Sequence, residues 1–227
     1  MSLFNVVKVS CPSCGSPVEF NAVFSVNADR RQDLRAAILN GSFQRQACPK
    51  CNTEFRLDPE LTYLDVGRGQ WIAVFPVAKL GQWKELEHQS RATFAKAYGE
   101  GASAAAREIG AGLKARLVFG WAALREKLVA AEKGLDDVTL ELTKSAMVRG
   151  LDNPPVGPGT ELRLGKVDGD SLAIVWLQSA NEEVKEAMRV PRSLYNEIAA
   201  EPAGWQALRD ELTSGPFVDV NRLLVTA

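Results

Sequence analysis

The chain has 227 residues, 46% of them hydrophobic, and a formal net charge of −1 at pH 7. This is enough for a sizeable buried core in one large domain or two small ones, and a pI near 6.0 argues against a general nucleic-acid binder, which needs a strongly basic surface. Residues 117–124, the longest uncharged apolar run of the helical middle, fall far short of the roughly 20 residues that span a bilayer. Since residues 1–9 do not resemble a secretory signal, we expect a soluble, cytoplasmic protein.

The first part of the chain predicts β structure around two cysteine motifs. Alternating apolar residues indicate strands at residues 3–9 and 18–26, before and after Cys11-Pro12-Ser13-Cys14. A helix follows, capped by Asn27 or Asp29 and ended by Asn40-Gly41. Short strands, at residues 43–47 and 53–57, lead into and out of the second motif, Cys48-Pro49-Lys50-Cys51.

The two motifs contain all four cysteines of the chain: Cys11, Cys14, Cys48 and Cys51. Two Cys-x-x-Cys turns can place four thiolates tetrahedrally around one ion, which is the usual arrangement of structural zinc. Gly15 and Asn52, which follow the motifs, tolerate the positive φ that such turns require. Iron is the alternative metal, because four thiolates also bind iron. Disulfides need a secretory context, and a thioredoxin-type site needs one cysteine pair rather than two matching pairs.

The order of these motifs resembles the bacterial CpXC proteins. The similarity rests on Val9-Ser10-Cys11-Pro12-Ser13-Cys14-Gly15, Val26-Asn27, Ala47-Cys48-Pro49-Lys50-Cys51, and Tyr63-Leu64-Asp65 before a strand that ends at Pro76. A second likeness lies in Arg116-Leu117-Val118-Phe119-Gly120 and Leu124-Arg125-Glu126-Lys127. The resemblance implies a zinc-ribbon-like module and a bound metal, but no activity, because the family has no assigned function. Asn52 stands where glycine is commoner, which affects the turn and not the ligands.

Beyond the second motif, a hairpin is predicted and then a helical region. Residues 61–66 and 70–75 flank Gly67-Arg68-Gly69, so they predict two strands joined by a turn. From Lys79 onward the apolar spacing becomes helical and predicts three helices, which cover residues 83–98, 113–133 and 137–150. The small, glycine-rich stretch between the first two, residues 99–112, reads as a hinge or a loosely packed helix.

The predicted helix 113–133 has an unusually wide apolar face. This face consists of Leu113, Leu117, Trp121, Leu124 and Leu128, joined by Val118, Phe119 and Val129. Burial between the zinc-bearing sheet and the C-terminal hairpin is one explanation. The other is that Phe119 or Trp121 packs against a second copy of the chain or a partner protein, where aromatic residues contribute strongly to binding.

A proline- and glycine-rich stretch at residues 152–159 breaks the chain. Beyond it, residues 161–167 and 171–177 predict a hairpin about Asp168-Gly169-Asp170. Residues 184–190 fit a helix or a strand, and short helices are expected at residues 193–199, 204–212 and 220–224. The expected domains are a CpXC module (1–78), a helical region (79–151), a linker (152–159), and a C-terminal hairpin with short helices (160–227).

The sequence predicts no catalytic residue. His88 is the one histidine, so a Ser-His-Asp triad or an HExxH zinc site does not fit. Asp136, Asp137 and Glu141 could share a Mg²⁺ ion, but helix capping and a favourable helix dipole explain the first two without a metal, and we prefer that explanation.

We therefore expect an α+β protein with a structural zinc site, acting as a non-enzymatic interaction or adaptor protein. The alternative is a nucleic-acid-binding regulator that uses the basic residues of the ribbon, and an enzyme of unknown chemistry ranks third. Those basic residues are Arg30, Arg31, Arg35, Arg45 and Lys50.

Overall fold

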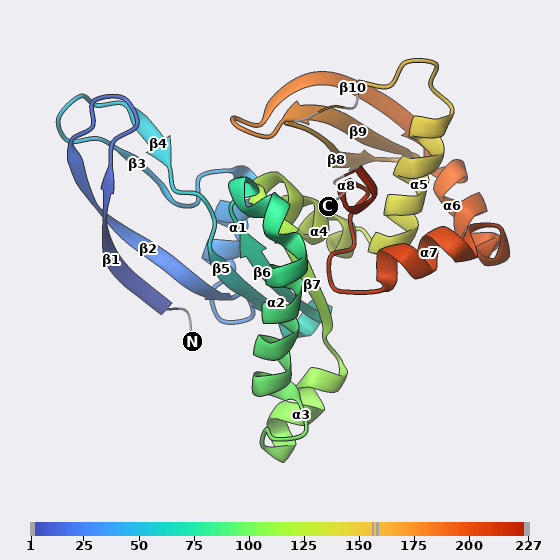
Figure 1. The fold of residues 1–227 in the computed structure, drawn as a ribbon, viewed down its shortest axis with the longest axis horizontal. Helices are drawn as coiled ribbons and strands as arrows, with labels where there is room; N and C mark the ends of the chain where they lie inside the picture. Colours follow the sequence, from blue (N-terminus) through green and yellow to red (C-terminus); the bar gives the residue numbers. More distant parts are fainter. Residues whose placement is uncertain (1–2, 156, 158, 225–227) are drawn as a thin grey trace.

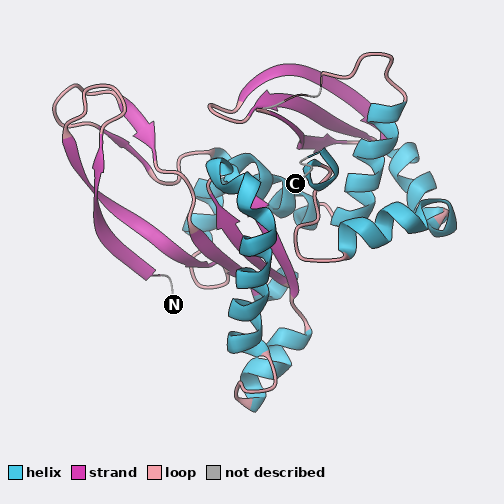
Figure 2. Cartoon of the chain, viewed as in Figure 1, coloured by secondary structure: helices cyan, strands magenta, loops and turns pink. Residues whose placement is uncertain are grey.

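The computed structural model describes residues 3–155, 157 and 159–224, and within them it shows a mixed α+β fold with three sheets (Figures 1 and 2). This confirms the expected fold class. A five-stranded sheet has the order β1-β2-β5-β6-β7, and its strands are β1 (Leu3–Ser10), β2 (Pro17–Asn27), β5 (Leu61–Asp65), β6 (Gln70–Phe75) and β7 (Lys114–Phe119). A two-stranded sheet pairs β3 (Arg45–Ala47) with β4 (Glu54–Arg56). A three-stranded sheet contains β8 (Thr160–Asp168), β9 (Ser171–Gln178) and β10 (Glu183–Pro191).

The five-stranded sheet mixes both kinds of pairing. β1 pairs antiparallel with β2, and β5 with β6, whereas the β2–β5 and β6–β7 pairs are parallel. Parallel neighbours need a crossover connection, and helices supply it here. The predicted alternation of β2 is confirmed, because Val18, Phe20 and Ala22 are all buried. β1 forms one edge of this sheet.

The helix after β2 forms, but its predicted cap was wrong. α1 (Gln32–Asn40) begins after Arg31 with no side-chain cap, and it ends at Gly41, which has a left-handed φ of 80° as expected. The carboxylate of Asp29 accepts instead from the amides of Val66 and Gly67, at 2.7 and 3.0 Å. Asp29 therefore ties the end of β2 to the turn after β5 rather than capping the helix.

The single helix predicted over residues 113–133 is wrong in its first third. Residues Lys114–Phe119 form β7, which pairs with β6, and only Gly120–Glu132 form a helix, α4. β7 is buried on both faces: Leu117 and Phe119 pack in one core cluster, and Val118 in another. A short apolar run of this kind cannot be told from a buried helix by periodicity alone. The apolar face looked wide because a strand that is buried on both faces was predicted as part of a helix. The region 79–151 is therefore not wholly helical.

Helices cover both faces of the five-stranded sheet (Figure 1). On one face, α1 and α4 enclose a core that includes Ile38, Tyr63 and Leu124. On the other, α2 (Trp83–Tyr98) packs over a core that includes Trp71 and Leu117. The glycine-rich stretch after α2 contains α3 (Ala104–Ala111), which Ser103 caps.

The C-terminal sheet packs against α4 and α5 (Asp137–Arg149). β10 resolves the ambiguous residues 184–190 as a strand, and the predicted hairpin between β8 and β9 is confirmed, with a positive φ of 57° at Gly169. The remaining helices are α6 (Arg192–Ala200), α7 (Gln206–Thr213) and α8 (Asn221–Leu224), and 3₁₀ helices lie at Val66–Arg68, Val77–Gln82 and Pro202–Trp205.

The division of the chain into domains stays a prediction. Residues 156 and 158 of the predicted linker 152–159 lie outside the described residues. Among those that are described, no helix is both long and apolar enough to cross a membrane.

Candidate metal centre

The two cysteine motifs lie in neighbouring turns. Cys11 and Cys14 are in the turn between β1 and β2, and Cys48 and Cys51 are in the turn between β3 and β4. Both turns lie at one end of the molecule, away from the C-terminal sheet (Figure 1). Two hairpins that are separate in sequence therefore present their tips to each other.

The two turns have the same backbone hydrogen bonds. The amide of Gly15 donates to the Cys11 carbonyl, and the amide of Asn52 donates to the Cys48 carbonyl, both at 2.9 Å. Gly15 and Asn52 both have left-handed φ values, 69° and 58°, which confirms their predicted role. Asparagine therefore serves here in place of the commoner glycine.

The four sulfur atoms form one compact group. The Sγ atoms of Cys11 and Cys51 lie 3.7 Å apart, as do those of Cys14 and Cys48, and all four atoms lie within 4.8 Å of one another. Zn–S bonds of about 2.3 Å in a tetrahedron place the sulfur atoms about 3.8 Å apart. The cluster therefore fits one tetrahedral metal ion.

Neighbouring hydroxyls favour the thiolate form of the two outer cysteines. The hydroxyl of Thr53, followed by its amide, stabilises the Cys51 thiolate and lowers the pKa of this group to about 6. Ser16 acts in the same way on Cys14 and lowers its pKa. Since the thiolate is the metal ligand, both residues prepare the site for a cation. Cys11 and Cys48 are instead buried, against Val9, Val18 and Phe55.

The acidic group considered for Mg²⁺ makes other contacts. Asp136 caps α5, and its Oδ1 accepts from the Thr139 amide at 2.9 Å, as the capping explanation predicted. Asp137 binds Arg116 and Lys127, and Glu141 lies 2.8 Å from the ammonium of Lys144. Cationic side chains therefore already occupy the positions that a Mg²⁺ ion would take.

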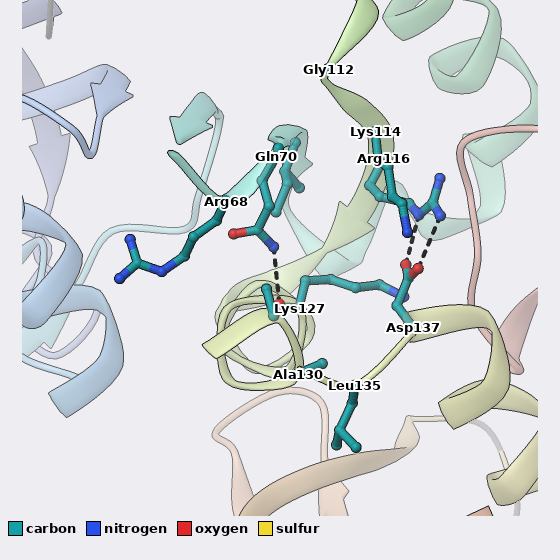
Figure 3. A pocket seen from close by; sticks show the side chains of 12 residues that line it. Arg68, Gln70, Gly112, Lys114, Arg116, Lys127, Ala130, Leu135 and Asp137 are labelled. Carbon is teal, nitrogen blue, oxygen red and sulfur yellow. Dashed lines mark hydrogen bonds and ion pairs between the residues drawn. The ribbon is translucent and has the colours of Figure 1, made fainter. Parts of the chain in front are cut away.

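A cationic cavity of about 300 Å³ lies between the start of β7, α4 and the start of α5 (Figure 3). Its charged lining consists of Arg68, Lys114, Arg116, Lys127 and Asp137. Each cation already has a carboxylate partner: Asp137 pairs with Arg116 at 2.6 Å and Lys127 at 3.0 Å, Arg68 with Asp65 at 3.0 Å, and Lys114 with Asp136 at 3.5 Å. The cavity therefore offers little uncompensated charge to an anion.

A buried network of charged side chains, which the sequence did not predict, lies between α4, α5, β8 and the segment before α8. Its members are Glu126, Lys127, Glu141, Lys144, Glu161, Arg163 and Asp219, all at most 4% exposed. Burial lowers the pKa of Lys144, but the charges of Glu126 and Glu141 outweigh that effect and raise it. The sequence does show charged residues within the apolar helices after residue 120. Such residues usually lie on a solvent-exposed face, so the pattern did not indicate a buried network.

Comparison with known proteins gives a single kind of match. The model of the CpXC protein family matches residues 9–144, which is more than half of the chain and includes both cysteine motifs, β7 and α4. Neither the curated proteins nor the solved structures contain a match. The match extends well beyond the first third of the chain, where the sequence motifs are clearest. The chain belongs to the CpXC family.

Proposed function

We propose that Cys11, Cys14, Cys48 and Cys51 bind one Zn²⁺ ion whose role is structural, and that the chain is a non-enzymatic interaction or adaptor protein. The convergence of four sulfur atoms within 4.8 Å supports the first part. Four protein thiolates saturate a tetrahedral ion and leave no open position for a substrate, unlike catalytic zinc sites. The metal would join the two hairpin tips at the small apolar cluster that Val9, Val18 and Phe55 form with the buried cysteines.

The surface that the sequence suggested for a partner is not accessible. Phe119 and Trp121 are 2% and 5% exposed, because they pack inside the chain. Burial within the chain accounts for these apolar residues of segment 113–133 and counts against a partner or a second copy on this face.

The edge of β1 is a better surface for the proposed interaction. Leu3, Phe4 and Val6 are large apolar side chains of this strand, and they are 53%, 37% and 68% exposed. An edge strand also presents backbone groups that can pair with an extended peptide. We therefore propose that a partner adds a strand beside β1.

The nucleic-acid alternative receives less support from the contacts of the basic residues. Arg31 pairs with Asp33, Arg35 with Asp65 and Glu132, and Arg45 with Glu54. Ion pairs of this kind reduce the positive potential that would attract phosphates. Iron remains the alternative metal, since the same sulfur geometry accepts it.

Metal analysis of the purified, reduced full chain tests the first part of the proposal. We expect about one zinc per chain and a colourless protein, whereas iron would give a red one. Protein without bound metal would refute the site.

Affinity capture tests the interaction. Val6→Lys should abolish recovery of the partner identified with the unaltered chain, because it places a charge on the exposed edge. Val184→Lys is the matched control, since Val184 lies on the other sheet and is 55% exposed. Equal recovery with both variants would exclude the β1 edge.

A further inference from the structure

A second cavity, of about 240 Å³, lies where three parts of the chain meet. The segment after β4, the start of α4 and the turn between β9 and β10 all contribute to its lining. The residues that matter here are Arg45, Arg56, Trp121, Ala122, Ser179 and Asn181. The cavity does not include the cysteine cluster, so it is separate from the proposed metal site.

The guanidinium of Arg56 is the unusual group in this cavity. It lies over the ring of Trp121, 4.2 Å from the centroid, and its Nε donates to the Phe43 carbonyl at 2.9 Å. The side chain is 9% exposed. Both terminal nitrogens are buried and have no hydrogen-bond partner among the described residues. Buried donors without acceptors are rare in proteins, so this one calls for an explanation.

The charge of Arg56 is poorly compensated by the chain itself. The nearest carboxylate, Glu182, lies 3.9 Å away and is hydrogen-bonded to Arg125. Glu161, which also lines the cavity, binds Arg163 at 2.8 Å. Burial lowers the pKa of Arg56 to about 10, which still leaves the group charged at neutral pH. Asp58 is the third carboxylate of the lining, but it is exposed and forms no ion pair with Arg56 in the described part of the chain. A buried cation with so little compensation favours an anion beside it.

The start of α4 supplies further donors to the same space. Gly120, Trp121 and Ala122 line the cavity, and no side chain caps this 13-residue helix. The first amides of a helix have no acceptor within the helix, and the helix dipole places partial positive charge there. Trp121 is held in place, because its Nε1 donates to the Leu57 carbonyl at 2.9 Å. Anions bind at such helix ends when a fixed cation faces them.

We propose that this cavity binds the carboxylate or phosphate group of a small organic molecule, held by the terminal nitrogens of Arg56 and the first amides of α4. Two parallel N–H donors of a guanidinium match two oxygens of either group. Stacking on Trp121 fixes the plane of the guanidinium and so prepares that geometry. Ser179 and Asn181 line the part of the cavity that the rest of the molecule would occupy. This inference does not depend on the proposed metal or adaptor role.

Calorimetric titration of the full chain with inorganic phosphate, and separately with acetate, tests the proposal at constant ionic strength. We expect saturable binding of at least one of the two. If only phosphate binds, the ligand of the cavity is a phosphate ester, and if only acetate binds, it is a carboxylate. If both bind, the cavity recognises the paired oxygens that the two groups share. Arg56→Gln and Arg56→Lys should each weaken binding about tenfold or more, because lysine lacks the paired donors.

Lys114→Gln is the matched control, since it alters the other cationic cavity. It should bind like the unaltered chain. The proposal is overturned if neither anion binds, if the Arg56 variants bind like the unaltered chain, or if the Lys114 variant alone loses binding. Amide NMR of the unaltered protein serves if the Arg56 variants do not fold: added anion should shift the signals of Trp121 and Ala122, and unchanged signals would also overturn the proposal.

Discussion

The ammonium of Lys144 lies 2.9 Å from a carboxylate oxygen of Glu126, and both side chains are completely buried. Lys144 also lies 2.8 Å from Glu141, while Arg163 bridges Glu126 and Asp219. These contacts connect α4, α5, β8 and the segment before α8. The junction between the two larger sheets of the protein therefore contains ionic groups as well as apolar ones.

Removing Lys144 should be strongly destabilising. Lys144→Met leaves Glu126 and Glu141 buried without their shared cation, and breaking a buried pair in this way costs about 3–5 kcal/mol. Chemical denaturation would measure the loss as a lower midpoint. The control is Lys166→Met, because its pair with Asp168 is exposed and should contribute about 1 kcal/mol or less. Similar midpoints for the two variants would contradict a structural role of the network.

Stability should fall in acid through Asp137. Burial raises its pKa, but the charges of Lys127 and Arg116 outweigh that effect and hold the pKa well below its ordinary range. A carboxylate whose pKa is depressed in the folded state stabilises the protein fully at pH values above the pKa of the same group in the unfolded chain, near 4. This contribution is lost as the pH falls below that value. Asp137→Asn should therefore be destabilising at pH 7, and the difference from the unaltered chain should shrink below about pH 4. A difference that stays constant over this range, in urea denaturation, would rule out this linkage.

Gly120→Ala should be destabilising because of the backbone. Gly120 has a φ of 83° where β7 passes into α4, and an added Cβ would lie 2.6 Å from Cγ2 of Val77. A non-glycine residue in this region costs about 1–3 kcal/mol before any clash is added. Gly204→Ala is the control, since Gly204 has open space around it and no positive φ, and we expect a change of about 0.5 kcal/mol or less. If the two variants have the same melting temperature, Gly120 is not required for its backbone conformation.

Loss of one metal ligand should loosen the hairpin tips first. Cys11→Ser removes a thiolate from the proposed zinc site, and binding energy of a structural zinc is also folding energy. Amide hydrogen exchange should accelerate in the turns that carry the cysteines, while the C-terminal sheet keeps its protection. Ser13→Ala, an exposed change within the same motif, should leave exchange unchanged. Unaltered protection in the cysteine variant would mean that the ion does not stabilise the fold.

The sequence predicted the cysteine cluster well because the features that define each cysteine turn lie within a few neighbouring residues. Spacing, proline and a residue that tolerates positive φ define each turn, and two similar turns predict one shared site. Segment 113–133 was harder, since a strand buried on both faces has the apolar content of a buried helix. Only the pairing of Lys114–Phe119 with β6 distinguishes the two. The Arg56 cavity was not predicted at all, because Arg56, Trp121 and Ser179 meet only through the tertiary fold.

The segment 216–220 contacts elements that are made long before it. The carbonyl of Pro216 accepts from the Leu117 amide, that of Val218 accepts from Lys127, and Phe217 packs against Trp83 and Phe119. During synthesis, the core between β7 and α2 therefore stays partly open until residues 216–220, which lie far later in the sequence, have also been made. Before that point, the nascent chain exposes the aromatic surface that Phe217 later covers, and we expect chaperones to protect it.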